Sequence, residues 1–400
     1  MLSYKKEVST DKLRLGMYVI ELDRPWTETN FPFQGFPITS HEQIDQLKSY
    51  CKIVYIDPER EEIKPEARRV VPLMTERQIY SEVVPVEQEL PIAKEIYRSC
   101  EDALRHLIVT VRSEGEIDAR ALTSAMNSMI GTIQRSPDAM LLLKALRRRD
   151  SYELTRSLDT SILMVTLGRY LQYPAARLEV LGLAGMLLDV GMTSLPEGVV
   201  EAYNSDEAVD KGVIETHVLH SVELVRGARG LPQGVDEVVA LHHERQDGEG
   251  YPHGLSGDQI AADGAIAAIV DSYSKLTSPR QKVCSLSPSR ALSQLHKERG
   301  RAFEETLLEQ FIQCIGIYPV GGAVELNTGE AGLVIAQNPL RRLLPRVMVM
   351  LDAAGKRIHP QLILDLMKEP KTSSGESYKI KRALPLDQLP LEEDDFLLYP

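Results

Sequence analysis

Helical periodicity constrains the fold of this chain more than any other feature. From about residue 93 to 348, apolar side chains recur at the three- and four-residue spacings of amphipathic helices. Residues 162–171 and 178–188 are strongly apolar, which is typical of helices buried in a core, and Pro174 separates them. This pattern predicts a mainly α fold built around a helical domain.

Shorter segments precede the helical block. Residues 17–20 and 53–57 have strand character, and residues 41–47 between them are typical of a helix. We therefore expect a small α+β domain over residues 1–70. The following residues, 71–92, contain prolines and glutamates without clear periodicity, which predicts a linker.

A change to β patterning marks the end of the helical block. Three short apolar runs with turn residues between them predict a small β-meander within residues 323–350. The all-helical domain, with this C-terminal meander, is expected over residues 93–352. Residues 353–400 are charged and contain several prolines, so we expect a C-terminal segment that is partly mobile.

Composition and charge exclude several classes of protein. The 400 residues are 43% hydrophobic and carry a formal net charge of −12, which fits folded domains and disfavours a nucleic-acid binder. No stretch approaches the roughly 18 uninterrupted apolar residues of a membrane span, and no apolar leader follows the first residues. The four cysteines lack CxxC spacing, which is typical of free thiols in a reducing compartment. We expect a cytoplasmic protein without a membrane span.

One segment carries a specific chemical pattern. Residues 242–252 read HHERQDGEGYP, so the adjacent histidines His242 and His243 precede a turn-forming sequence. Gly248 and Gly250 permit the backbone geometry that such a turn needs. Two neighbouring imidazoles at a helix end can point into one site while the loop folds back over it.

Other candidate ligands lie elsewhere in the helical block. His217 lies in a predicted helix, and Asp189 and Asp271 lie at or near the ends of apolar runs. Histidine and carboxylate side chains that converge from several helices are typical ligands of Fe, Mn or Zn. Taken singly, a helical histidine is more often a buried polar residue, and an aspartate after an apolar run is usually a cap. The pattern at 242–252 favours the metal-site interpretation.

With these residues, the run from about 150 to 350 resembles an HD-GYP domain, the branch of the HD phosphohydrolase superfamily that hydrolyses the bacterial second messenger cyclic di-GMP. The first 60 or so residues, with Trp26, resemble a small domain of unknown function often found before HD-GYP domains. The other matching segments are 215–217, 269–273, 276–280, 316–321 and 324–326. The resemblance implies a site for two metal ions.

Three positions depart from the family pattern. Leu188 stands where the family has the histidine of its His-Asp pair, Met192 replaces a lysine implied to contact phosphate, and Arg156 replaces the first metal-binding histidine. By this comparison one ion keeps only Asp189 and Asp271 as ligands. Two carboxylates beside a cationic arginine are a poor transition-metal site.

The resemblance leaves the other ion with a complete ligand set, namely Asp189, His217, His242 and His243. We therefore expect at most one divalent ion (Fe, Mn or Zn) and lost or very weak hydrolysis, with Asp189 the residue that would carry any activity. Arg156 is expected to pair with Asp189, with Asp271 or with a ligand phosphate. The alternative is that Arg156 turns to solvent.

Ligand and partner contacts also follow. Arg245, Lys275 and Arg280 are candidates for a locally basic pocket that would let an acidic chain bind cyclic di-GMP, although such cations are usually solvated. The loop Gly250-Tyr251-Pro252 is the kind of surface through which family members are proposed to contact diguanylate cyclase (GGDEF) domains.

Two classes of function remain open. A degenerate HD-GYP protein would act as a receptor or as a GGDEF-binding interaction module. A residual enzyme would be a metal-dependent phosphodiesterase for cyclic di-GMP or its linear product, with a variant metal site. A third interpretation gives the activity to the N-terminal domain and makes the helical body a scaffold for a homodimer, paired through helices within residues 93–148.

Overall fold

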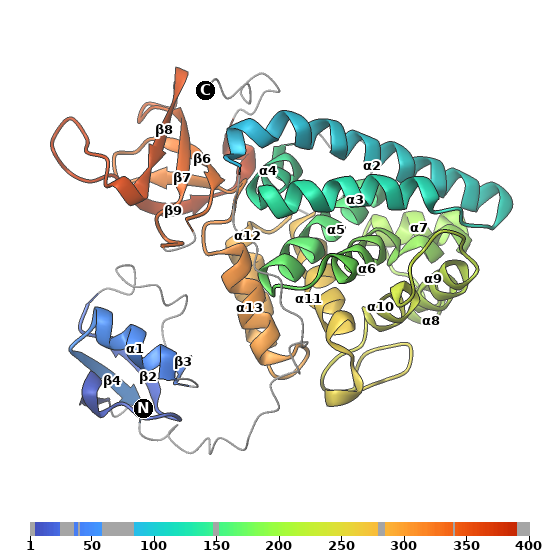
Figure 1. Ribbon diagram of the computed structural model, residues 1–400, viewed down its shortest axis with the longest axis horizontal. Helices are drawn as coiled ribbons and strands as arrows, with labels where there is room; N and C mark the ends of the chain where they lie inside the picture. Colours follow the sequence, from blue (N-terminus) through green and yellow to red (C-terminus); the bar gives the residue numbers. More distant parts are fainter. Residues whose placement is uncertain are drawn as a thin grey trace. The chain divides into compact units, whose positions relative to one another are not determined.

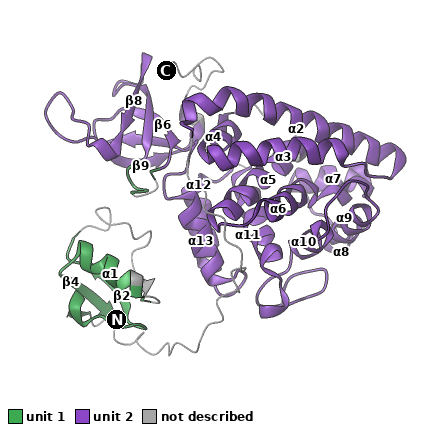
Figure 2. Cartoon of the chain, viewed as in Figure 1, with its two compact units in different colours: residues 1–75, 338–344 green, residues 76–337, 345–400 purple. Residues whose placement is uncertain are grey.

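The computed structural model describes residues 5–24, 36–38, 41–57, 84–146, 152–278, 285–338 and 341–389. The chain divides into two compact units, one of residues 1–75 with 338–344 and one of the remaining residues (Figure 1, Figure 2). Helices make up most of the second unit, as the periodicity predicts.

The first unit is a small antiparallel sheet with one helix. Its strands follow the order β1-β4-β2-β3. Ile44 and Leu47 of the helix are buried in a common core with Val19, Val54 and Ile56 of the strands. The elements are β1 (Lys6–Ser9), β2 (Tyr18–Leu22), β3 (Phe36–Pro37), α1 (His41–Tyr50) and β4 (Ile53–Asp57). The predicted α+β arrangement is confirmed, and Trp26 lies outside the described residues.

The second unit begins with a long helix, and this corrects the predicted linker. The helix α2 starts at Val86, within the expected linker, because this end is held by packing and by an ion pair of the buried Glu89. Val86 and Leu90 are buried, and the carboxylate of the buried Glu89 accepts two hydrogen bonds from the Arg135 guanidinium. These contacts are distant in sequence, so local composition could not reveal them.

The helical body consists of α2 and the helices that follow it (Figure 1). The helices are α2 (Val86–Glu114), α3 (Arg120–Arg135), α4 (Pro137–Leu146), α5 (Tyr152–Tyr170), α6 (Ala175–Leu187), α7 (Glu197–Asn204), α8 (Lys211–Glu215), α9 (His217–Arg226), α10 (Val235–Leu241), α11 (Ala262–Thr277), α12 (Pro288–Lys297) and α13 (Glu305–Ile315). Pro174 is the N-cap of α6, so the predicted break between the two apolar helices is confirmed.

The apolar helices α5 and α6 approach each other closely at two glycines of α6. A Cβ at Gly185 would lie 2.7 Å from the Cα of Ser161, and one at Gly182 would lie 2.9 Å from a methyl of Val165. The hydroxyl of Ser161 also donates a hydrogen bond of 2.8 Å to the carbonyl of Gly182. This close packing brings the start of α5 and the end of α6 side by side.

The second unit also contains a five-stranded antiparallel sheet, which extends beyond the predicted meander. The strands are β5 (Ala323–Leu326), β6 (Ala331–Ala336), β7 (Arg346–Leu351), β8 (Arg357–Asp365) and β9 (Ile380–Leu384), in the order β8-β7-β6-β5-β9. The predicted domain boundary at residue 352 therefore falls inside the sheet. β8 and β9 are edge strands with exposed and half-buried residues, so their apolar signal is weak.

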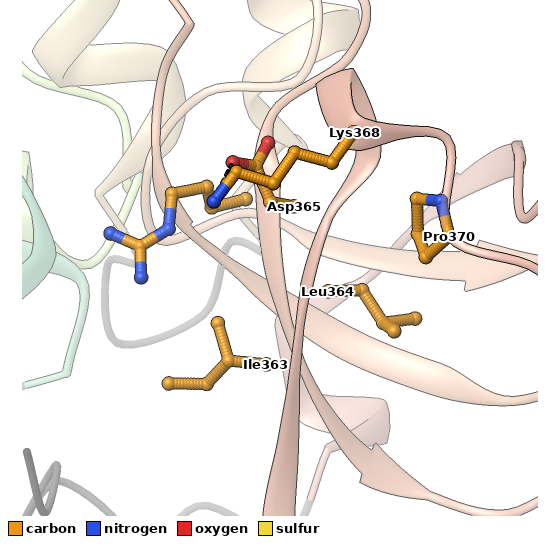
Figure 3. Close-up of a pocket in the computed structure, with 6 residues that line it drawn as sticks. Ile363, Leu364, Asp365, Lys368 and Pro370 are labelled. Carbon is orange, nitrogen blue, oxygen red and sulfur yellow. Dashed lines mark ion pairs between the residues drawn. The ribbon is translucent and has the colours of Figure 1, made fainter.

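A cavity of about 480 Å³ lies beside the strands β7 and β8 (Figure 3). Its charged groups are already paired, because Lys368 lies 3.6 Å from Asp365 and Arg346 pairs with Glu87 of α2. The lining residues are Arg346, Ile363, Leu364, Asp365, Lys368 and Pro370. None of the residues singled out from the sequence lines this cavity.

A search of the described residues for membrane-spanning helices finds none that is long and apolar enough.

Candidate metal centre

Side chains from five helical segments meet in one cluster. The helix α5 packs against α6 and α11, and α10 packs against α9 and α11. The cluster consists of Arg156 on α5, Asp189 just after α6, His217 at the start of α9, His242 and His243 after α10, and Asp271 on α11. Five of the six are buried, and the side chain of Asp189 is 18% exposed. We call this group the buried cluster.

His242 and His243 follow the end of α10, as the sequence predicts, and His217 lies in a helix as predicted, at the first residue of α9. Asp271 differs, because it lies inside α11 and not near its end. The fold nevertheless brings all five predicted metal-ligand candidates together with Arg156.

Two of the imidazoles are held in a fixed orientation by the backbone. Nδ1 of His217 lies 2.7 Å from the carbonyl oxygen of Ile214, and Nδ1 of His242 lies 2.6 Å from that of Val239. A carbonyl can only accept, so each Nδ1 carries a proton, and in the neutral ring the lone pair then lies on Nε2. The Nε2 atoms lie 3.2 Å (His217) and 3.8 Å (His242) from Oδ1 of Asp189.

One side of the buried cluster, which we call the imidazole side, consists of His217, His242, His243 and Oδ1 of Asp189. Its geometry fits one divalent transition-metal ion. Asp189, His217, His242 and His243 each offer one ligand atom, and these atoms all lie within 4.8 Å of one another. The Nε2 atoms of the three histidines are buried without a hydrogen-bond partner among the described residues. Three imidazoles and one carboxylate are a donor set that Zn, Fe or Mn accepts.

The protonation of the histidines suits a metal site. Burial lowers the pKa of His242 to about 4. Burial, followed by the electrostatic interactions with His242 and Lys275, holds the pKa of His243 well below its ordinary value. Both rings are therefore neutral near pH 7, which is the form that binds a metal ion.

The carboxylate side of the cluster is held by an arginine. One terminal nitrogen of Arg156 donates to Oδ2 of Asp189, and the other donates to Oδ1 of Asp271. Burial opposes ionisation of both carboxyls, but the charge of Arg156 keeps the pKa of each below its ordinary value. The guanidinium thus bridges two ionised carboxylates.

This bridge confirms the predicted pairing of Arg156 and excludes its alternative. The side chain of Arg156 is 8% exposed, so it does not turn to solvent. It pairs with Asp189 and with Asp271 at the same time. Asp271 lies outside the four-residue metal-binding group, whereas Asp189 belongs to it and has its Oδ1 free of Arg156.

The Gly-Tyr-Pro loop lies against the imidazole side. The Tyr251 ring packs on His243, with centroids 4.6 Å apart and an interplanar angle of 33°. Burial raises the pKa of the Tyr251 hydroxyl, which stays protonated. Gly250, Tyr251 and Pro252 are half-buried, so the predicted partner loop forms a wall of the cluster. Contact with a GGDEF domain stays a prediction.

The predicted basic contacts fall into different settings. The Arg245 guanidinium donates a hydrogen bond of 2.9 Å to the carbonyl of Glu244 and lies 5.3 Å from the ring centroid of Phe303. Its contacts are therefore with the protein itself. Lys275 lies one turn after Asp271 on α11, and its charge lowers the pKa of both Asp271 and His243. Lys275 therefore adds a positive charge near these two residues. Arg280 lies outside the described residues.

Two residues of this region were not singled out from the sequence. The first is Tyr203 of α7, whose ring centroid lies 5.7 Å from the ammonium of Lys275. Glu244 is 1% exposed and binds the backbone of the loop. Tyr203 has no local signal, whereas Glu244 directly follows the paired histidines.

Comparison with known protein families matches most of the chain. An HD domain matches residues 120–307, and a domain of unknown function, DUF3391, matches residues 5–122. A KOW domain associated with HD domains matches residues 323–373. The DUF3391 match covers β1 to α2, and the KOW match covers β5 to β8.

Curated relatives are phosphodiesterases by name. A cyclic di-GMP phosphodiesterase of Pseudomonas aeruginosa is 29% identical over 374 residues, which is 92% of this chain and 90% of that protein. A 3'3'-cGAMP-specific phosphodiesterase of Vibrio cholerae is 33% identical over 131 residues, which is 32% of this chain and 25% of that protein.

A solved structure of a related kind also matches. It is a HDG"Y"P protein from Bdellovibrio bacteriovorus, with 12% identity, a TM-score of 0.46, and coverage of 77% of this chain and 98% of that one. From these matches, the chain carries an HD domain, with a DUF3391 domain before it and a KOW domain associated with HD domains after it, and over most of its length it is similar to a protein named as a cyclic di-GMP phosphodiesterase.

Proposed function

We propose that this protein is a receptor in cyclic di-GMP signalling that binds one divalent ion and hydrolyses the nucleotide weakly or not at all. The observation that carries the proposal is the Arg156 bridge between Asp189 and Asp271. In the family resemblance these two carboxylates serve the first ion, and here a guanidinium engages both. A fixed positive charge at that place repels a second cation.

The remaining ligand set supports one ion. Asp189 Oδ1 and the three Nε2 atoms would hold it, and the ion would supply a positive charge for a phosphate oxygen. A two-ion site in addition clamps both the attacking and the leaving oxygen of a phosphodiester. The residues here provide for one side of that clamp only.

Two apolar side chains support the loss of hydrolysis. Leu188 is buried at the end of α6, and the family resemblance places a metal-binding histidine there. Met192 stands where the resemblance places a phosphate-contacting lysine. Neither side chain can donate to or ligate a phosphate group.

The chain's own residues suit binding of an anionic nucleotide. Lys275 supplies a cation beside the buried cluster, and Tyr251 supplies an aromatic ring at its wall. Cations pair with phosphates and aromatic rings stack on bases. Curated relatives are named for cyclic di-GMP, which is the ligand that we propose. A cytoplasmic location, a GGDEF partner and a homodimer stay predictions.

A second candidate is a slow one-metal phosphodiesterase. The observation in its favour is the intact four-residue group, which leaves one ion able to polarise a phosphate. This enzyme would act on cyclic di-GMP or on its linear product.

A gain-of-function variant tests the proposal. The wild-type chain and the double variant Arg156→His with Leu188→His are loaded with Mn²⁺, and binding and hydrolysis of cyclic di-GMP are measured by calorimetry and chromatography. We expect the wild type to bind without turnover, and the double variant to gain turnover because two imidazoles return. The matched control is Arg156→Asn with Leu188→Asn, whose amides are poor ligands for transition metals.

Each outcome decides between the alternatives. Slow turnover by the wild type that depends on Mn²⁺ supports the one-metal phosphodiesterase. Turnover by the wild type equal to that of the double variant contradicts the assigned role of Arg156. Absence of nucleotide binding contradicts the receptor.

A further inference from the structure

Glu244 is a buried carboxylate whose partners are backbone amides of the Gly-Tyr-Pro loop. It is 1% exposed and directly follows the two cluster histidines. Its Oε1 accepts a hydrogen bond of 2.8 Å from the N–H of His253, and its Oε2 accepts one of 2.9 Å from the N–H of Leu255. A charged acceptor with two backbone donors makes a strong local attachment.

The loop is pressed onto the chain around Glu244. The N–H of Tyr251 donates to the carbonyl of His243 at 3.2 Å. A Cβ at Gly250 would lie 2.4 Å from the nitrogen of Arg245 and 2.6 Å from the Cα of Glu244, so only glycine fits there. The loop therefore starts at residue 244, turns, and is pinned back on the residue from which it started.

His243 differs from the other two imidazoles in how its ring is held. Nδ1 of His217 and of His242 each bind a backbone carbonyl. Nδ1 of His243 lies 3.8 Å from Oδ2 of Asp271, which is beyond hydrogen-bond distance. The loop supplies a contact in its place, namely the Tyr251 ring at 4.6 Å.

We propose that Glu244 is a positioning residue that holds Tyr251 on His243 and so presents the third imidazole to a divalent cation. This inference rests on the metal site of the proposed function. It assigns to the glutamate of the string a task that neither binds the ion nor contacts a substrate. It also makes the Gly-Tyr-Pro loop a part of the metal site.

Substitution of Glu244 separates this role from simple packing. Glu244→Ala leaves the two loop amides without their acceptor, so the loop and Tyr251 move away from His243. Glu244→Gln keeps one carbonyl acceptor and turns an amide N–H₂ toward the other donor, so half of the attachment remains. The matched control is Glu249→Ala, an exposed residue of the same loop.

The probe is Co²⁺ alone, titrated into the full chain while its visible absorption is recorded. The intensity and position of the cobalt bands report the ligand set. For Glu244→Ala we expect a 10- to 100-fold weaker cobalt affinity, as for other residues that orient metal ligands, and a spectrum like that of His243→Ala. Glu244→Gln is expected to lie between Glu244→Ala and the wild type, and Glu249→Ala to match the wild type.

The experiment distinguishes failure of the proposed metal site from failure of the role that we assign to Glu244. If wild-type protein binds no cobalt, the proposed metal site is wrong. If it binds cobalt and Glu244→Ala lowers the melting temperature without changing affinity or spectrum, Glu244 is only structural and the inference is wrong. If Glu244→Ala does not fold, Glu244→Gln decides, and wild-type affinity and spectrum for that variant overturn the inference.

Discussion

Both sides of the buried cluster contain potential metal ligands, but only on the carboxylate side are these ligands already bound by a positively charged side chain. On the imidazole side, Asp189 and three histidines each offer one ligand atom within 4.8 Å of the others, and Oδ1 of Asp189 and the three Nε2 atoms have no hydrogen-bond partner among the described residues. On the carboxylate side, oxygens of Asp189 and Asp271 are bound by Arg156. The imidazole side therefore has free ligand atoms for a cation, and on the carboxylate side the cation is the Arg156 guanidinium.

Under the proposed function, charge opposes the binding of an ion on both sides of the cluster. With neutral imidazoles, two carboxylates and one guanidinium leave the cluster with a single net negative charge. One divalent ion changes the net charge from −1 to +1, and neighbouring dipoles and a bound phosphate can balance this single positive charge. A second divalent ion would leave three uncompensated positive charges in a buried place, at a large cost in free energy. In the proposed function, Arg156 therefore takes the place of one of the two ions that the family resemblance implies.

The largest predicted effect comes from breaking the carboxylate side. Arg156→Met removes the cation between two buried carboxylates while keeping much of its volume. We expect a loss of about 3–5 kcal/mol in the free energy of unfolding, measured by urea denaturation without added metal. Added Mn²⁺ is expected to restore part of the loss, because the carboxylates are then free to bind an ion.

The control for this variant is an exposed ion pair. Arg226→Met removes an arginine that is 66% exposed and pairs with Asp236. Its effect is expected to be at most about 1 kcal/mol. Equal effects of the two arginine substitutions would show that Arg156 does not hold the cluster together.

Substitution of a ligand on the imidazole side is expected to lower the affinity for a metal ion more than it lowers the stability of the fold. His242→Ala removes one ligand, so the affinity for Zn²⁺ is expected to fall by more than the roughly 100-fold loss seen when only an orienting partner is removed. Competition with a chromophoric chelator measures this affinity. His220→Ala, a half-buried histidine of α9 outside the cluster, is the control. Unchanged affinity in His242→Ala would contradict the assigned ligand set.

The smallest predicted effect concerns the loop that covers the imidazole side. Gly250→Ala places a methyl group against the backbone at residues 243–245, and we expect about 1–3 kcal/mol of destabilisation from this overpacking. Thermal unfolding of the variant measures the effect. Gly198→Ala on α7 is the control, since no atom lies within 4 Å of its added methyl. A stable Gly250→Ala protein would mean that the loop is not pressed on the cluster.

Much of the fold could be predicted because it rests on local pattern. The helices α5 and α6 and the small first unit follow from periodicity and from Pro174. The start of α2 and the strand β9 could not be predicted, because each is held by partners distant in the chain. Arg135 pairs with Glu89 across 46 residues, and β9 pairs with β5, more than 50 residues earlier.

The candidate site shows the same division. The string at 242–252 and its resemblance to a family predicted the histidines, and the departure at Arg156 predicted an ion pair. Which carboxylate the arginine would choose could not be predicted, since that depends on how α5, α6 and α11 pack. The role of Glu244 was missed for a related reason, because its partners His253 and Leu255 become neighbours only when the loop closes.

The number of metal ions per chain tests the central claim most directly. The wild-type protein is purified without chelator and saturated with Mn²⁺, excess metal is removed, and the metal is counted by mass spectrometry against protein concentration. One ion per chain for the wild type and two for Arg156→His with Leu188→His is the predicted result. Two ions per wild-type chain would contradict the claim that Arg156 takes the place of an ion.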